Sequence, residues 1–216
     1  MNFLSIVTNK VGENGHINAQ KRLGTRLKEL SVKRTMVEQN NNMIPEFITP
    51  DFNEVEELID LEKQVWLTTY PNAEYYVTKE DILARFDNHA SRVQVVMADL
   101  NNQNHRYFLI QIGSKHVGYM HLERQIEHNH IVELYILTEF QGIGIGSSAV
   151  EYAFTWFGDR KPIFLQVVSY NQSAIDFYEK FGFLIDPSIH RDPNDRWNLL
   201  PSGKYIPVVS MVKHFV

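Results

Sequence analysis

The segment from Leu134 to Gly146 constrains this chain more than any other stretch of its sequence. An apolar run, predicted to be a buried strand, leads through a short loop into three glycines at alternate positions, Gly142, Gly144 and Gly146, where a helical pattern begins. Glycines leave the backbone N–H groups uncovered, and the first N–H groups of a helix have no partner within it. They also lie at the positive end of the helix dipole. This turn is therefore predicted to hold a diphosphate without a lysine.

Two other glycine motifs do not fit this turn. A P-loop requires Gly-Lys-Ser/Thr, and no lysine follows the glycines. A dinucleotide-binding turn requires G-x-G-x-x-G and an acid at the end of the next strand, but that strand ends in Val167-Val168-Ser169-Tyr170. A tight turn with no ligand is the remaining alternative. Because each glycine costs a helix about 1 kcal/mol relative to alanine, the binding interpretation is favoured.

A second motif lies at 171–183, with the sequence Asn-Gln-Ser-Ala-Ile-Asp-Phe-Tyr-Glu-Lys-Phe-Gly-Phe. Together with the run Gln-Gly-Ile-Gly-Ile-Gly at 141–146, it resembles the two signatures of the GNAT superfamily of acetyl-CoA-dependent N-acetyltransferases. The turn departs from the family pattern at Ile143, where a basic residue is usual, and this leaves most of the phosphate binding to the backbone. A narrower resemblance, over Val65–Asp87, is to bacterial spermidine/spermine acetyltransferases.

The predicted elements after Met43 run in the order helix, helix, three strands, helix, strand, helix, strand. The first helix is expected from Val55 to Trp66, and the second begins with a capping box formed by Thr78 and Asp81. The strand at 131–137 is nearly all apolar and is expected to be buried on both faces. Hairpins followed by a β–α–β unit predict an α/β fold. Its sheet is expected to be mixed, with parallel and antiparallel strands, as in α+β proteins. Its N-terminal part is expected to be antiparallel, with helices on both faces, as in the GNAT-like acyl-CoA N-acyltransferase fold.

Charge divides the 216-residue chain into two parts. Residues 1–42 hold seven basic and three acidic residues, a net charge of +4, so the overall charge of −5 leaves −9 on the remainder. We expect 1–42 to be a flexible or partly helical N-terminal appendage and 43–216 to be the acetyltransferase domain. An acidic body repels nucleic acid and suits a cationic small molecule. The sequence leaves the oligomeric state open, with a homodimer as one option.

Composition excludes several other classes of protein. The chain has no cysteine, which excludes a disulfide scaffold and a cysteine nucleophile. No apolar stretch approaches the ~20 residues of a membrane span, and the N-terminus lacks a signal peptide, so a cytoplasmic protein with no membrane partner is expected. Four histidines crowd one hairpin region without a recognised zinc-binding spacing, so they are expected at the surface and no metal is expected. They are His116, His121, His128 and His130.

The resemblance implies which residues hold acetyl-CoA as the co-substrate. The end of the strand before the turn is expected to pair with the pantetheine arm, the turn and the start of the helix with the phosphates, and Asn171 and Tyr178 with the rest of the coenzyme. The residues assigned to the strand end, turn and helix start are Ile136, Leu137, Thr138, Gln141, Gly142, Ile143, Gly144, Ile145, Gly146 and Ser147.

Two side chains are predicted to be catalytic. Tyr178 matches the family tyrosine that protonates the leaving thiolate, and a phenol with a pKa of about 10 can supply that proton at neutral pH. The alternative is that Tyr178 only packs on its helix. Glu133 lies within an apolar strand, where desolvation would raise its pKa and suit it to accept a proton from the amine. The alternative is that Glu133 has a structural role, with its carboxylate paired with Arg124 or with a backbone N–H.

The acceptor is expected against the first two helices and the loop between them, where aromatic and acidic side chains suit an ammonium. The residues assigned to it are Trp66, Tyr70, Glu74 and Tyr75. The sequence thus predicts an acyltransferase that moves an acetyl group from acetyl-CoA to a primary amine, such as a polyamine, by direct attack in a ternary complex. A protein N-terminal or lysine acetyltransferase, and a non-catalytic acyl-CoA sensor of the same fold, are the alternatives.

Overall fold

The computed structural model describes residues 44–158, 160–189 and 197–215, all of which belong to the unit Ile44–Val216. The appendage expected at 1–42 lies outside the described residues, so its role stays a prediction. No helix among the described residues is long and apolar enough to cross a membrane.

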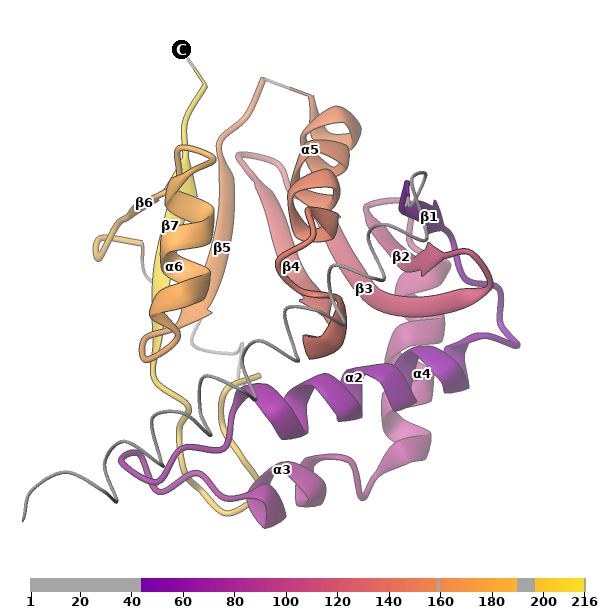
Figure 1. Cartoon of the computed structure of the whole chain (residues 1–216), viewed down its shortest axis with the longest axis vertical. Coiled ribbons are helices and arrows are strands. Elements are labelled where there is room, and N and C mark those ends of the chain that lie inside the picture. Colours follow the sequence, from indigo (N-terminus) through magenta and orange to yellow (C-terminus); the bar gives the residue numbers. More distant parts are fainter. Residues whose placement is uncertain (1–43, 159, 190–196, 216) are drawn as a thin grey trace, which may run out of the picture. The chain divides into compact units, whose positions relative to one another are not determined.

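A seven-stranded mixed sheet forms the centre of this unit, with the strand order β1-β2-β3-β4-β5-β7-β6 (Figure 1). Only β4 and β5 pair in parallel, and every other neighbouring pair is antiparallel. The predicted fold class is therefore confirmed, including its antiparallel N-terminal part. The strands are β1 Glu46–Ile48, β2 His105–Ile112, β3 Lys115–Arg124, β4 Asn129–Ile136, β5 Ile163–Val168, β6 Leu184–Ile185 and β7 Val208–Lys213.

Helices cover both faces of the sheet, as expected. Tyr107 and Leu109 of β2 belong to a buried cluster with residues of the first three helices, whereas Phe108 between them packs on Tyr152 of α5. Because successive side chains of a strand point to opposite faces, these helices lie on opposite sides of the sheet. The helices are α2 Val55–Thr69, α3 Lys79–Arg85, α4 His89–Leu100, α5 Ile145–Phe157 and α6 Gln172–Glu179, with a 3₁₀ turn at Thr138–Phe140.

Helix α4 and the short strand β6 were not expected from the sequence. The α4 segment has one fully buried side chain, Val96, so its apolar stripe is weak. Its start is marked by Asn88, whose side chain accepts a hydrogen bond from the backbone N–H of Ser91. The capping box predicted at the start of α3 is confirmed, since Thr78 and Asp81 each accept a hydrogen bond from the other's backbone N–H.

Candidate active site

Strands β4 and β5 pair over only three residues and then separate. The parallel register runs from Asn129↔Ile163 to Ile131↔Leu165, although β4 continues to Ile136 and β5 to Val168. On its other side β4 stays paired with β3, where a shift in register leaves Val132 as an extra, bulged residue. A bulge bends its strand, and this bend coincides with the point of separation. Beyond it, no strand of the described part of the chain pairs with the β5-facing edge of β4.

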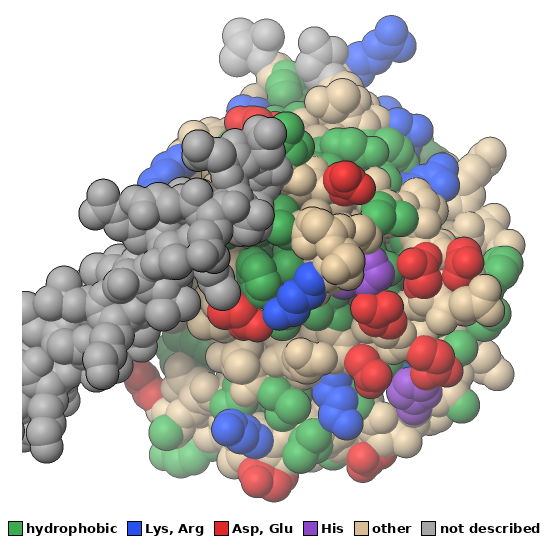
Figure 2. All heavy atoms as spheres, turned by 45° about the vertical axis from the view of Figure 1, so that its right-hand side comes forward, with side chains coloured by type: hydrophobic (Ala, Val, Ile, Leu, Met, Phe, Trp, Pro, Cys, Tyr) green, Lys and Arg blue, Asp and Glu red, His purple; other side chains and the backbone are tan. Residues whose placement is uncertain are grey.

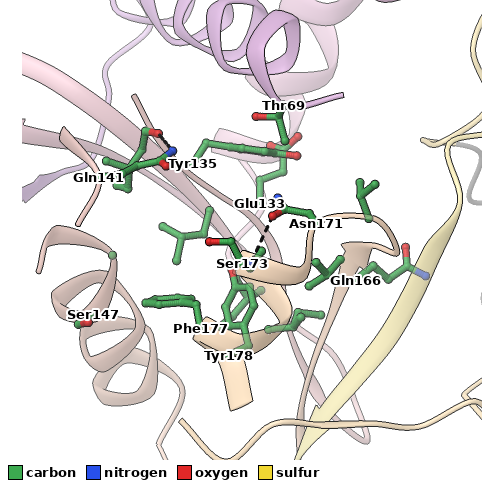
Figure 3. A pocket seen from close by; sticks show the side chains of 18 of the residues that line it. Thr69, Glu133, Tyr135, Gln141, Ser147, Gln166, Asn171, Ser173, Phe177 and Tyr178 are labelled. Carbon is green, nitrogen blue, oxygen red and sulfur yellow. Dashed lines mark hydrogen bonds between the residues drawn. The ribbon is translucent and has the colours of Figure 1, made fainter. Parts of the chain in front are cut away.

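Helices α5 and α6 flank the separated strands (Figure 1). A cavity of about 490 Å³ lies between these four elements (Figure 3). The diverging halves of β4 and β5, the glycine turn, the first turn of α5 and one side of α6 line it. Figure 3 shows Glu133 of β4 and Asn171, Ser173 and Tyr178 around its centre. The expectation that the strand at 131–137 is buried on both faces is therefore wrong. Most of its residues border the cavity and are half-buried.

The glycine turn has the geometry that the sequence predicted. Gly142 and Gly144 have φ angles of 78° and 96°, and a Cβ atom added at either position would meet nothing within 4 Å. Gly144 is the N-cap of α5 and has no side chain with which to cap that helix. The backbone at the start of α5 is thus uncovered, as an anion site requires. Gln141 ties the turn to the end of β4, because its Nε2 donates to the carbonyl of Ile136 at 2.8 Å.

Gly146 has a different role from the other two glycines. It lies inside α5, and an added Cβ would come within 3.4 Å of the Phe177 ring of α6. This is an ordinary van der Waals distance, so the space between α5 and α6 beside the cavity leaves room for a Cβ at this position but little more.

The structure brings most of the predicted coenzyme residues to the cavity, but not all. Those that line it are Ile136, Gln141, Gly142, Gly144, Gly146, Ser147, Asn171 and Tyr178. Leu137, Thr138, Ile143 and Ile145 are not among the lining residues. The backbone N–H of Leu137 donates to the carbonyl of Val117 on β3, so it faces away from the opening, and the Ile145 side chain is buried in the core.

Glu133 occupies a buried and charged environment. Its Oε1 lies 3.5 Å from Nη2 of Arg92, whose Nε donates to the buried Glu62 at 2.8 Å. Its Oε2 has no hydrogen-bond partner among the described residues. Burial, and then the negative charge of Glu62, raise the pKa of Glu133 to about 7, against the opposing effect of Arg92.

The sequence offered Arg124 as a possible partner of Glu133, and the structure contradicts this pairing. Arg124 instead stacks on the ring of Trp156 and contacts its carbonyl oxygen. The carboxylate is thus paired with an arginine from α4, the helix that was not expected.

Tyr178 lies in α6 and reaches the same cavity as Glu133 (Figure 3). Its side chain is buried, and burial raises the pKa of its hydroxyl well above the ordinary value. The hydroxyl therefore remains protonated at neutral pH and can donate a proton or a hydrogen bond into the cavity.

The residues expected to hold the acceptor do not lie together: one lines the first cavity, one borders a second cavity and two line neither. Tyr70 lines the cavity and contacts the hydroxyl of Tyr135, a lining residue that the sequence did not single out. Trp66 is almost fully buried and borders a second cavity. Glu74 and Tyr75 line neither cavity, and Tyr75 stacks on Tyr170.

The second cavity, of about 800 Å³, shares residues of the diverging strands with the first. Val132, Glu133 and Tyr135 of β4 border both cavities, so Glu133 lies where the two meet. Glu123 and Glu127 also line the second cavity, and no lysine or arginine is among its described lining residues. The sequence did not indicate this site because its carboxylates come together only through strand pairing.

Histidines form another part of this cavity. His105, His121, His128 and His130 line it. His121 is 5% exposed, so the expectation that the histidines of this region lie at the surface is wrong for this residue. It stacks on the ring of Tyr107, with 4.0 Å between the ring centroids.

Comparison with known proteins agrees with this geometry. A search of curated proteins found no match. Among solved structures, the chain resembles the PaiA N-acetyltransferase of Thermoplasma acidophilum in complex with coenzyme A, with 18% identity and a TM-score of 0.60 over 80% of this chain and 100% of that one.

Two further solved structures share the fold. Naa50 of Arabidopsis thaliana, bound to the bisubstrate analogue CoA-Ac-MVNAL, is 20% identical with a TM-score of 0.50, over 79% of this chain and 99% of that one. A chimera of the spermidine N-acetyltransferase SpeG from Vibrio cholerae and hSSAT is 18% identical with a TM-score of 0.54, over 78% of this chain and 93% of that one. The narrower resemblance to polyamine acetyltransferases is therefore one among several.

A sequence profile described as the acetyltransferase (GNAT) family matches residues 52–183, which include α2, the separated strands, the glycine turn and α6. The match extends over more than half of the chain and contains every residue that lines the first cavity. This chain belongs to the acetyltransferase (GNAT) family.

Proposed function

We propose that this protein transfers the acetyl group of acetyl-CoA, its co-substrate, to a primary amine of a small cationic molecule such as a polyamine. The observation that carries this proposal is the position of Glu133. This carboxylate, with a pKa of about 7, lies where a cavity suited to the coenzyme meets an acidic cavity suited to the amine.

The residues around the first cavity fit coenzyme A. The diphosphate would lie against the uncovered N–H groups at the start of α5, beside Gly142 and Gly144, where a negative charge is favoured by the helix dipole. The pantetheine arm carries two amides, and the edge of β4 that faces away from β3 has backbone groups able to bond them. Asn171 caps α6 through its Oδ1, and its Nδ2 has no described partner, so the amide can donate to the coenzyme.

Glu133 would remove the proton that keeps the amine unreactive. An alkyl ammonium has a pKa of about 10.4, so only about one molecule in a thousand is a free amine at pH 7. Once Glu133 accepts the proton, the nitrogen attacks the thioester carbonyl carbon and a C–N bond forms. When the tetrahedral intermediate collapses, the C–S bond breaks and the sulfur takes a proton from the hydroxyl of Tyr178. The proton that the new amide nitrogen gives up restores this hydroxyl, and Glu133 releases its own proton to solvent.

The second cavity supports a cationic acceptor. Glu123 and Glu127 supply negative charge, and Trp197 supplies aromatic surface for an ammonium. Figure 2 shows acidic side chains gathered on one face of the molecule, so the surface can also attract cations from solution. A small polyamine satisfies these features better than an apolar amine.

The acceptor class can be tested by measuring the thiol released from acetyl-CoA with a panel of amines. We expect release with spermidine or spermine, and little with an uncharged amine of similar length. Release only with peptides that have a free N-terminus would instead identify a protein acetyltransferase. Tight binding of acetyl-CoA with no thiol release from any amine would indicate a sensor.

The glycine turn can be tested with the same substitution at the two ends of α5. Gly144→Asp places a side chain and a negative charge where we put the diphosphate, and we expect the affinity for coenzyme A to fall at least about 100-fold in calorimetry. Gly158→Asp is the matched control, because Gly158 also has a positive φ, of 76°, and open space around an added Cβ. Equal affinities in the two variants would contradict the assignment of the phosphate site.

Tyr178→Phe removes the proposed proton donor and keeps the ring. We expect kcat to fall about 10²-fold or more, with the dissociation constant of coenzyme A nearly unchanged, because the hydroxyl acts on the leaving sulfur. Tyr152→Phe, which removes a hydroxyl from a tyrosine outside both cavities, is the control. An unchanged kcat in Tyr178→Phe would remove this residue from the mechanism.

Because of Glu133, the pH profile of kcat should have an acidic limb, in which kcat falls as the pH is lowered. Since its pKa is raised to about 7, the group is protonated and inactive as a base below that pH, and kcat measured at saturating substrates should rise to a plateau above it. Glu133→Gln should lower kcat about 10²–10⁴-fold and abolish this limb. Glu57→Gln, at an exposed acid of α2, should keep both. The same limb in Glu133→Gln would show that another group is the base.

A further inference from the structure

Three potential metal ligands from different elements meet on the α2–α4 side of the sheet. Asp99 comes from the last turn of α4, His105 from the first residue of β2 and His121 from β3. The hairpin register pairs Tyr107 with His121, and His105 lies two residues before Tyr107 on the same face of β2. The short connection from α4 to β2 then brings Asp99 next to both histidines.

The donor atoms of these side chains have spacings close to those of a metal site. His105 Nδ1 lies 2.9 Å from His121 Nε2 and 3.9 Å from Asp99 Oδ1, and one donor atom from each residue lies within 4.8 Å of the others. In a tetrahedral zinc site with bonds of about 2.0–2.1 Å, donor atoms are about 3.3 Å apart. The two distances from His105 Nδ1 bracket this value, so only small shifts of the donor atoms would be needed to close the site.

Each of the three donors also has an outer partner of the kind that supports metal ligands. The second nitrogen of His105, Nε2, lies 3.8 Å from Glu123 Oε1, and the second nitrogen of His121, Nδ1, lies 3.9 Å from Glu133 Oε2. The second oxygen of Asp99 accepts a hydrogen bond from the hydroxyl of Tyr107 at 3.2 Å. A carboxylate behind each metal-binding histidine is the usual arrangement in protein metal sites, since it fixes the tautomer and orients the ring.

The buried oxygen of Glu133 supports the same interpretation. Glu133 Oε2 has no hydrogen-bond partner among the described residues, and the nearest ring nitrogen is Nδ1 of His121. If Nε2 of His121 binds a metal ion, Nδ1 must carry the proton and can donate it to this oxygen. An ion would therefore satisfy a buried group that has no partner otherwise.

We propose that Asp99, His105 and His121 form a divalent transition-metal site, with zinc as the ion that best suits two imidazoles and one carboxylate. Both histidines line the second cavity, which supplies an entry path and an open fourth position for water. Because the acceptor would be drawn to the carboxylates of this cavity, zinc is expected to compete with a cationic amine and to inhibit acetyl transfer rather than assist it.

Calorimetric titration of the full-length, tag-free protein with Zn²⁺ tests the site without any turnover, so its result is independent of the proposed function. We expect one ion per chain. Asp99→Asn and His105→Gln should each weaken binding at least about 100-fold, and Glu123→Gln, which alters an outer partner, about 10–100-fold. His116→Gln is the matched control, because His116 is also on β3 but pairs with Glu57 instead.

Titration with Co²⁺ gives a second measurement on the same variants. A site with four or five ligands gives Co²⁺ a stronger visible absorption than its hydrated ion has, and we expect this absorption in the wild type and in His116→Gln but not in Asp99→Asn. The proposal is overturned if the folded wild type shows no saturable zinc binding, which would leave the two histidines simply hydrogen-bonded to each other. It is equally overturned if Asp99→Asn and His105→Gln bind zinc as tightly as the wild type.

Discussion

The separation of β4 from β5 after Ile131 and Leu165 is the feature on which the rest of the site depends. Pairing along the full length of both strands would fill the opening, and the glycine turn at the end of β4 would then have no cavity beside it. Because β4 remains bonded to β3 through its bulge, the open edge is held by a rigid sheet rather than by a loop. The unpaired edge of β4 needs hydrogen-bond partners, and a ligand with amide groups can supply them.

Burial of charge gives this opening its chemical character. Glu62, Arg92 and Glu133 place two carboxylates around one guanidinium in a region shielded from water. Burial, and then the charge of a second carboxylate that one arginine cannot fully compensate, raise the pKa of Glu133 to about 7. The group can therefore exchange its proton near neutral pH, which an exposed glutamate cannot do. The position of this carboxylate between two cavities turns a buried ion cluster into a candidate catalytic centre.

The sequence predicted the parts of the site that depend on local order. The glycine turn, the strand before it and the helix with Tyr178 lie within about fifty residues. The turn itself predicted a diphosphate site, and the resemblance of the two motifs to the GNAT signatures implied that the ligand is coenzyme A. Arg92 was missed because it lies in α4, whose apolar pattern is too weak to mark a helix. Asp99, His105 and His121 were missed as a group because they meet only through a tertiary contact and a hairpin register. Trp66 was placed with the acceptor from its neighbours in sequence, whereas packing buries it in the core.

Backbone amide hydrogen exchange with and without coenzyme A tests the central claim most directly. The account predicts that the coenzyme slows exchange in two segments, at 142–147 in the turn and first residues of α5 and at 132–136 along the open edge of β4. Exchange in α3, none of whose residues lines the coenzyme cavity, should change little. Unchanged exchange in both predicted segments at saturating coenzyme, or protection confined to other parts of the chain, would contradict it.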